Sequence, residues 1–243
     1  MLIYGLNPVL EALRAGRVDS IRLAARGDSR VNAVIDAAKK AGVAIKRVDA
    51  SELDRVSRGG VHQGVVALVP DQESLGIEEL VASAAGAPLL VVLDGVEDPH
   101  NVGAILRTVD AAGASGVVRQ QRHAAPLGGA AAKASAGAVS HVKVADVVNV
   151  ARAIEELKEA GVWTVGLAGD AQKRYDEIDY TLPTALVVGA EGAGLRRLVR
   201  ERCDWLVSIP MQGHVQSLNV SVATGVVLFE AVRQRLSRRS LDT

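Results

Sequence analysis

From residue 88 onward, short apolar runs alternate with segments of helical periodicity, and this alternation constrains the fold more than any other feature of the sequence. Six apolar runs stand out, at residues 89–93, 116–118, 142–144, 162–167, 185–188 and 206–209. Strands that are apolar on both faces are typical of a mainly parallel sheet that helices cover on both sides. We therefore predict an α/β fold with a mainly parallel sheet for residues 88–243.

The first 70 residues have a separate pattern of alternating helices and strands. Asn7 followed by Pro8 predicts the start of a helix that Gly16 closes, and Ser29 is expected to cap an alanine-rich helix that ends at Gly42. Strands are predicted at residues 21–24, 43–48 and 64–69. Together these elements predict a small α/β domain over residues 1–70, of about the smallest size that is stable alone.

Between the two patterns, residues 71–87 form an acidic stretch that contains glycine and lies between Pro70 and Pro88. We expect a linker here, with one short helix near residues 77–84. The whole chain has no net charge, but residues 1–70 carry eleven basic and seven acidic side chains, and residues 71–100 carry only acidic ones. The basic excess suits contacts with phosphates, and a solvated surface with a chance bias explains it equally well. Since aromatic residues make up 2% of the chain, we do not expect platforms for stacking bases.

The composition also bears on the compartment. Cys203 is the single cysteine, which excludes an internal disulfide and fits a reducing environment. No apolar run approaches the roughly 20 residues that span a bilayer. The first residues lack a basic segment followed by an apolar one, so no signal peptide is expected. These features predict a cytoplasmic protein without a membrane segment.

Three loops that follow predicted strands carry the candidate chemistry, because ligands of such sheets bind at the carboxyl ends of the strands. The first loop, at residues 94–107, leads into a helix with Gly103 one turn before Arg107, which leaves open space beside the guanidinium. A planar, charged guanidinium there suits an RNA phosphate. Alternatively, Arg107 pairs with Asp110 and Asn101 only caps the helix. His100 has no partner at the spacing of metal ligands.

The second loop, at residues 187–195, contains Gly189, Gly192 and Gly194. Glycines after a strand let a ligand approach the backbone closely. Their spacing matches neither a dinucleotide-binding fingerprint nor a phosphate-binding P-loop. The distinctive residue is Glu191, an acid for which a glycine loop has little structural need. A simple tight turn is the alternative explanation.

The third loop, at residues 209–221, opens a long helix that is predicted to run to about residue 236. Ser217 and Asn219 are residue types that cap helices, which is one explanation for them. The other is a ligand site, in which Ile209, Met211 and Leu218 line an apolar pocket with backbone hydrogen bonds. Such a pocket suits an adenine ring.

Taken together, the three loops resemble the three signature motifs of the SpoU (TrmH-type) class of SPOUT RNA methyltransferases, and the resemblance covers essentially the whole chain. The matching segments are residues 98–103 with Arg107, residues 189–192, and residues 208–211 with 217–221. The front of the chain is similar to the substrate-binding domain of this class at residues 4–9 and 62–64. Within the class, the chain is most similar to bacterial enzymes that methylate a guanosine ribose in 23S ribosomal RNA.

The resemblance implies a fold and a chemistry. It implies an RNA substrate-binding domain at residues 1–70, the linker at 71–87, and a SPOUT domain at 88–243 whose sheet ends in a trefoil knot. The cofactor would be S-adenosyl-L-methionine, the RNA site would be shared by a homodimer, and no metal would be needed. The positions that correspond to cofactor-binding residues are Leu167, Gly189, Gly192, Ile209, Met211 and Leu218. The positions that correspond to active-site residues are Asn101, Arg107, Glu191, Ser217 and Asn219.

Two alternatives stay open. A sister enzyme of the same class would methylate a 2′-oxygen of transfer RNA or of a ribosomal site linked to antibiotic resistance. A non-catalytic RNA-binding factor of ribosome assembly would keep the fold and lose the motifs. One segment also departs from the class: Gly128 and Gly129 stand where it has a threonine or asparagine after Leu127, and we expect a more mobile loop there.

Overall fold

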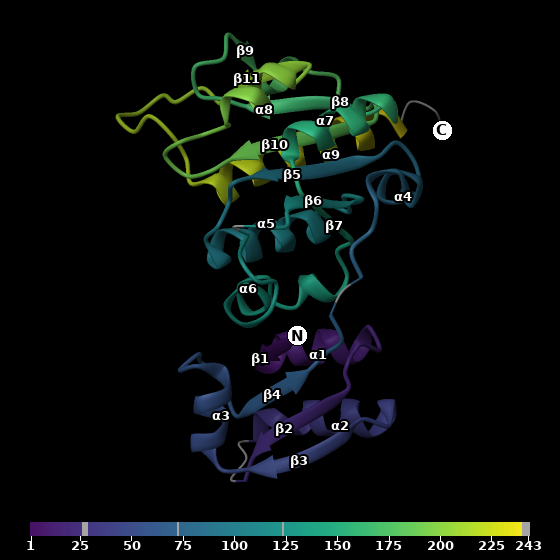
Figure 1. The fold of residues 1–243 in the computed structure, drawn as a ribbon, viewed down its shortest axis with the longest axis vertical. Helices are drawn as coiled ribbons and strands as arrows, with labels where there is room; N and C mark the ends of the chain where they lie inside the picture. Colours follow the sequence, from purple (N-terminus) through teal and green to yellow (C-terminus); the bar gives the residue numbers. More distant parts are fainter. Residues whose placement is uncertain (26–28, 72, 123, 240–243) are drawn as a thin grey trace. The chain divides into compact units, whose positions relative to one another are not determined.

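The structure is a computed structural model that describes residues 1–25, 29–71, 73–122 and 124–239. The chain divides into two units (Figure 1). The first unit comprises Met1–Gln72, Asp98–Arg107 and Ala125–His141. The second unit comprises Glu73–Glu97, Thr108–Ala124 and Val142–Thr243. Within the described residues, no helix is long and apolar enough to cross a membrane.

The first unit is built on a four-stranded sheet in the order β1-β4-β2-β3. In this sheet β4 pairs antiparallel with β1 and β2, whereas β2 and β3 are parallel. The strands are β1 (Leu2–Tyr4), β2 (Ser20–Ala24), β3 (Ala44–Val48) and β4 (Val65–Leu68), and the helices are α1 (Leu6–Arg14), α2 (Asn32–Ala41) and α3 (Ala50–Ser57). Ile3, Ile21, Leu23, Val34 and Leu53 form its buried interior. The helices and strands predicted over residues 1–70 are present, whereas β1 and α3 were not predicted.

The starts of the first two helices differ from the prediction. Helix α1 begins at Leu6, before Asn7, because the Gln63 Oε1 accepts the Leu6 backbone N–H at 3.1 Å and thereby caps the helix from a distant turn. Ser29 opens a short 3-10 turn, Ser29–Val31, and α2 begins only after it. The predicted end of α2 is confirmed, because Gly42 adopts the left-handed conformation, with φ 68°, that terminates a helix.

The atypical glycines lie at the start of helix α6 (Gly129–Ala134), where Gly128 is the N-cap residue and Gly129 the first helical residue. A Cβ atom on Gly128 would lie 2.7 Å from the Leu2 carbonyl oxygen and 2.8 Å from the Met1 Cγ. Gly129 has φ 55°, a conformation that favours glycine. The departure from the class pattern at Gly128 therefore lets this segment approach the first strand closely.

The second unit is built on a seven-stranded sheet in the order β7-β6-β5-β10-β8-β11-β9, in which every pair of neighbours is parallel. The strands are β5 (Leu89–Asp94), β6 (Gly116–Gln120), β7 (Val144–Val147), β8 (Trp163–Leu167), β9 (Lys173–Arg174), β10 (Thr184–Gly189) and β11 (Trp205–Ser208). Each of the six predicted runs corresponds to a strand, with β7 shifted toward higher residue numbers. The two-residue strand β9 was not predicted. The predicted parallel sheet is confirmed.

Helices α4 (Ile77–Ala82), α7 (Val150–Glu159) and α8 (Arg197–Arg202) contribute to one core with the sheet. In that core Leu80, Ile154 and Val199 are buried together with Ala185 and Val187 of β10. Helix α4 is the short helix expected in the acidic stretch. The buried Ile77 and Leu80 attach this helix to the second unit.

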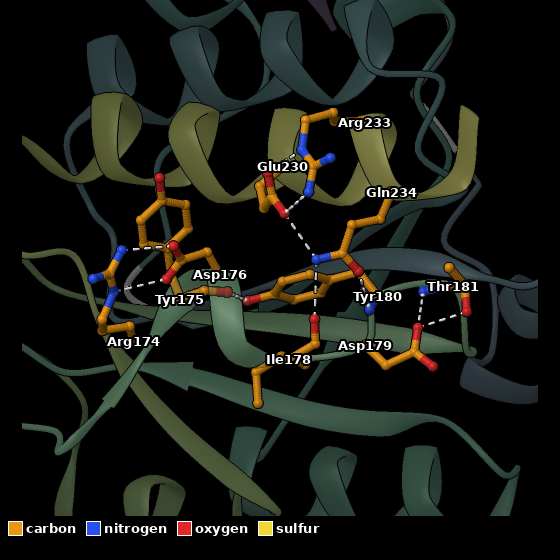
Figure 2. Close-up of polar contacts among 10 residues, drawn as sticks. All are labelled: Arg174, Tyr175, Asp176, Ile178, Asp179, Tyr180, Thr181, Glu230, Arg233 and Gln234. Atoms are coloured by element: carbon orange, nitrogen blue, oxygen red, sulfur yellow. Dashed lines mark hydrogen bonds and ion pairs between the residues drawn. The ribbon is translucent and has the colours of Figure 1, made fainter. Parts of the chain in front are cut away.

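Helix α9 (Val220–Arg239) packs against β10 and is fixed by polar contacts along its second half (Figure 2). The Gln234 side chain accepts the Tyr180 backbone N–H at 2.9 Å and donates to the Ile178 carbonyl at 3.0 Å. It also donates to Glu230 Oε1 at 2.8 Å. The Tyr180 hydroxyl donates to the Tyr175 carbonyl at 2.8 Å, and burial raises the pKa of this phenol. The loop that precedes α9 is therefore attached to a fixed helix.

Both tryptophans lie in the second unit. Trp163 opens β8 and Trp205 opens β11, and each is partly exposed. The Lys173 Nζ lies 4.1 Å from the centroid of the Trp205 ring, which is the geometry of a cation–π contact.

Candidate active site

The carboxyl ends of three adjacent strands surround a cavity of about 410 Å³ in the second unit. These strands are β10, β8 and β11. Because parallel strands end at the same edge of a sheet, the segments that follow them meet there. The cavity is lined by residues of three segments, 167–169, 188–194 and 207–223. Its volume is typical of a small-molecule site.

The glycine loop, defined here as residues 189–194, is a tightly closed turn. Ala190 and Gly194 exchange two backbone hydrogen bonds, of 3.1 and 2.8 Å. A Cβ atom on Gly189 would lie 2.1 Å from the Gly194 carbonyl carbon, so only glycine fits this crossing. The segment is thus a tight turn, as the alternative explanation predicted. It also lines the cavity.

Glu191 lies in the glycine loop, and its carboxylate has a defined partner. The Asn219 Nδ2 donates a hydrogen bond of 3.5 Å to the Glu191 Oε1. The Asn219 Oδ1 accepts the Ser221 backbone N–H at 2.9 Å and the Ser221 hydroxyl at 2.6 Å, at the start of α9. Asn219 therefore has both functions that its sequence position suggested, because its oxygen caps the helix and its amide faces the glycine loop.

The structure gathers nine of the eleven candidate residues around the cavity. They are Leu167, Gly189, Glu191, Gly192, Ile209, Met211, Ser217, Leu218 and Asn219. Leu167, Ile209, Met211 and Leu218 give the cavity an apolar part, and Glu191 gives it a negative charge. The assignment of these residues to a cofactor or to catalysis stays a prediction.

Sequence reasoning missed other lining residues, among them Ala168, Gly169, Val207, Gln216 and Ala223. Ala168 and Gly169 directly follow β8, so the rule that sites lie at strand ends was a sufficient signal for them. Gln216 carried no comparable signal. Ala223 lies one turn inside α9, where the helical pattern gave no reason to expect a ligand contact.

Asn101 and Arg107 belong to the first unit, on helix α5 (Pro99–Ala111). Asn101 is buried, and the helix is capped by Asp98, whose carboxylate accepts the backbone N–H groups of His100 at 3.1 Å and Asn101 at 3.3 Å. The alternative that the Asn101 side chain caps this helix is therefore wrong. Arg107 is exposed and forms no ion pair with Asp110 or with another described residue.

The sequence suggested that Gly103 leaves open space beside Arg107, and the structure contradicts this. The glycine is buried, and a Cβ atom on it would lie 2.5 Å from both the Ala131 carbonyl oxygen and the Ala134 Cβ. The missing side chain therefore lets α5 and α6 pack closely. Among the described residues, no three histidine, cysteine or acidic side chains are grouped as metal ligands would be.

Two family models match the chain. Residues 88–229 match the SpoU rRNA Methylase family, and residues 2–75 match the model for RNA 2′-O ribose methyltransferase substrate binding. The second match covers most of the first unit, and the first covers the strands and loops that surround the cavity.

Relatives match over nearly their full length. The 23S rRNA (guanosine-2′-O-)-methyltransferase RlmB of Pseudomonas syringae pv. tomato is 47% identical, over 98% of this chain and 97% of that protein. The protein of the same name from a Burkholderia species is 48% identical, over 98% of each chain. Among solved structures, the SpoU methyltransferase AviRb from Streptomyces viridochromogenes, in complex with AdoMet, superposes with a TM-score of 0.81. It is 27% identical, and the match covers 98% of this chain and 91% of AviRb. With a family model matching more than half of its length and relatives at this identity, the chain belongs to the SpoU rRNA methylase family.

Proposed function

We propose that this protein transfers the methyl group of S-adenosyl-L-methionine to the ribose 2′-oxygen of a guanosine in large-subunit (23S) ribosomal RNA. The observation that carries the proposal is the cavity, because residues of the second and third family motifs line it together. The names of the near full-length relatives support the substrate, and the AdoMet complex of AviRb supports the cofactor.

The residues around the cavity fit this cofactor. Leu167, Ile209, Met211 and Leu218 supply the apolar surface that an adenine ring prefers. Gly192 has no side chain and has open space where a Cβ atom would lie, so the ligand can approach the backbone there, whereas Gly189 lines the cavity and its missing side chain admits the crossing of Gly194. The carboxylate of Glu191, oriented by the Asn219 amide, supplies negative charge to a ligand that carries a positive sulfonium.

The cofactor supplies a methyl group on a positively charged sulfur, which makes that carbon open to attack by an oxygen nucleophile. A ribose hydroxyl is a poor nucleophile while it is protonated, so its proton must leave as the new bond forms. A guanidinium stays protonated near neutral pH, which makes it a poor base. In our proposal Arg107 binds a substrate phosphate and stabilises the developing alkoxide, and the proton passes to phosphate or solvent. Ser217 orients the ribose, and Asn101 belongs to the same motif as Arg107.

We further propose a separate role for each part of the chain. Residues 1–70 bind the RNA substrate, and residues 71–87 link them to the catalytic part. Residues 88–243 catalyse the methyl transfer, and their sheet ends in a trefoil knot. The match of residues 2–75 to a substrate-binding model supports the first role. The methyl donor is already activated by its charge, so the chemistry requires no metal.

A homodimer is part of the proposal. Helix α9 exposes a stripe of three apolar side chains spaced seven residues apart, Val222, Phe229 and Leu236. Residues at this spacing lie on one face of a helix, and an exposed apolar face favours association. We also propose a cytoplasmic location, where ribosomal RNA is made. The free Cys203 fits a reducing compartment, and burial raises the pKa of its thiol to about 12, which disfavours the reactive thiolate.

The test uses ribosomal RNA from a strain that lacks this gene, incubated with the purified protein and labelled S-adenosyl-L-methionine. Nuclease mapping and mass spectrometry then locate the label. We expect it on the ribose of one large-subunit guanosine, with loss of label in Arg107→Ala and retention in Arg152→Ala, which removes another exposed helical arginine. Label on transfer RNA alone would keep the enzyme class and overturn the substrate. Cofactor binding without label on either RNA would favour a non-catalytic assembly factor.

A further inference from the structure

Asp94 is a buried carboxylate that the proposed mechanism does not use. It is the last residue of β5 and is 0% exposed. Its Oδ1 accepts a hydrogen bond of 2.6 Å from the Arg196 Nε, and its Oδ2 accepts the Arg196 backbone N–H at 2.8 Å. A buried carboxylate is costly unless it is paired in this way, so a residue kept here requires an explanation.

The position of Asp94 connects it to both ends of the glycine loop. Its main chain is the register partner of Gly189, the residue at which the chain leaves β10 for the loop. Its side chain holds Arg196, which lies two residues after Gly194, where the loop ends. The bonds between Ala190 and Gly194 close the loop between these two attachments. Asp94 thus contacts the chain both where it enters the glycine loop and where it leaves it.

The pair contributes to stability as well as to position. The Arg196 side chain is 52% exposed but Asp94 is fully buried, so removing Arg196 leaves a buried charge poorly compensated and costs stability. Asp204 offers a comparison within the same sheet. Its carboxylate accepts from the Thr164 N–H at 2.9 Å and pairs with Lys158 at 2.8 Å, at the amino ends of β8 and β11, opposite to the ends that line the cavity. Asp204 links β8 to α7, whereas Asp94 links β5 to the end of the glycine loop, which lines the cavity.

We propose that Asp94 and Arg196 are positioning residues for the cofactor. They hold the glycine loop closed, so that Gly189, Glu191 and Gly192 line the cavity before the ligand arrives. The inference rests on the proposed function, because it assumes that S-adenosyl-L-methionine occupies this cavity. Without the pair, the end of the glycine loop is attached by fewer hydrogen bonds. Ordering the loop when the ligand binds then costs conformational entropy, which lowers the affinity.

The test measures the dissociation constant of S-adenosyl-L-methionine by calorimetry for two loop variants and two matched controls. Arg196→Ala and Asp94→Asn remove the charge pair. Arg197→Ala removes the neighbouring exposed arginine, which among the described residues pairs with Glu201 on its own helix. Asp204→Asn removes the comparable carboxylate elsewhere in the sheet. Thermal unfolding of each protein is recorded in parallel, without ligand.

We expect the dissociation constant to rise about tenfold in Arg196→Ala and at least as much in Asp94→Asn, the effect of one lost charged hydrogen bond. Arg196→Lys should recover part of this loss. Arg197→Ala should bind like the wild type, and Asp204→Asn should unfold earlier and bind like the wild type. Hydrogen exchange of the amides at residues 190–196 should quicken in the loop variants only.

Wild-type affinity in Arg196→Ala would overturn the inference, since binding would itself show that the variant folds. Loss of affinity in Asp204→Asn equal to that in Asp94→Asn would overturn it too, because general destabilisation would then explain both. Failure of the wild type to bind the cofactor would instead overturn the proposed function, so the two failures are distinguishable.

Discussion

At the scale of single residues, Asn219 shows how one side chain serves two neighbours. Its oxygen accepts two hydrogen bonds at the start of α9, and its amide donates one to Glu191. A helix cap contributes stability, whereas an amide that orients a carboxylate at a cavity contributes to ligand binding and catalysis. The two contributions can be separated, because they use different atoms of the same group.

Asn219→Asp keeps the capping oxygen and replaces the donor by a charge that repels Glu191. We expect the free energy of unfolding to change by less than about 0.5 kcal/mol, since aspartate caps as well as asparagine does. We expect kcat/KM for methyl transfer to fall by about tenfold or more. Chemical denaturation and methylation assays measure the two effects. Asn219→Ala, as the comparison, should lower both stability and activity, and equal activity of Asn219→Asp and wild type would contradict the assigned role.

Arg107→Lys keeps the charge of Arg107 and removes its planar, forked set of donors. Because two parallel bonds to a phosphate require that fork, we expect kcat/KM to fall by about tenfold or more. Thermal stability should stay unchanged, since Arg107 is exposed and has no ion-pair partner among the described residues. Steady-state kinetics with the RNA substrate provide the measurement. Nearly full turnover with unchanged RNA binding would count against the phosphate clamp.

The sequence predicted many of the residues at the cavity because each lies in a loop that follows a buried strand. Asp94 escaped prediction although it ends such a strand, because its partner Arg196 is 102 residues away. Gly103 was misjudged for a related reason. From sequence alone, a glycine on a helix predicts open space beside the helix. Here α6 fills that space, and the sequence around Gly103 does not reveal this packing.

At the scale of elements, α9 depends on polar contacts as well as apolar ones. Arg235 donates to four backbone carbonyls, those of Ala87, Pro88, Tyr180 and Leu182. The Glu230 carboxylate accepts hydrogen bonds from Arg233 and Gln234 on the same helix. The hydrogen bond from Arg233 lowers the pKa of the Glu230 carboxyl below its usual value of 4.5, despite some desolvation that raises it.

The lowered pKa of Glu230 makes its contribution to stability dependent on pH. A carboxyl whose folded pKa lies below its unfolded value stabilises the protein fully above the unfolded value, and this contribution is lost as the pH falls through the folded pKa. We therefore expect Glu230→Gln to lower the urea midpoint near pH 7 and to have a smaller effect near about pH 3. An equal effect at both values would contradict the role of the charge. Glu156→Gln, in an exposed pair on α7, is the control.

Strands were predicted better than helix ends. Parallel strands buried on both faces are apolar along their length, so the pattern of one segment suffices to detect them. The start of α1 depends instead on Gln63, which lies 57 residues from Leu6, and no local pattern contains that information. The strand β9 has two residues, Lys173 and Arg174, and owes its existence to its pairing with β11.

At the scale of the whole molecule, the two units are assembled from segments that alternate along the chain. Residues 98–107 and 125–141 belong with the amino-terminal sheet, and the segments between and after them belong with the parallel sheet. Composition and local periodicity describe neighbours in sequence, so they do not report such an exchange of segments. The contacts that define it, as at Gly128 and Met1, join residues more than a hundred positions apart.

The exposed stripe on α9 allows a test of the proposed homodimer. Phe229→Asp places a charge in the centre of the stripe, and we expect the dissociation constant of the dimer to rise by tenfold or more, since central aromatic residues dominate interfaces. Light scattering across a dilution series measures it. Val148→Asp alters another exposed apolar residue, outside α9, and should leave the dimer intact. A wild-type protein that is monomeric at all concentrations would refute the proposal.

The placement of Trp163 and Trp205 has a practical consequence for following this protein in solution. Both indoles lie in the second unit, and the first unit contains no tryptophan, so emission on selective excitation of indole comes from the second unit. Circular dichroism in the far ultraviolet, by contrast, senses the helices of both units. If the two optical signals are lost at the same denaturant concentration, the units melt as one cooperative body, and if they separate, each unit melts on its own.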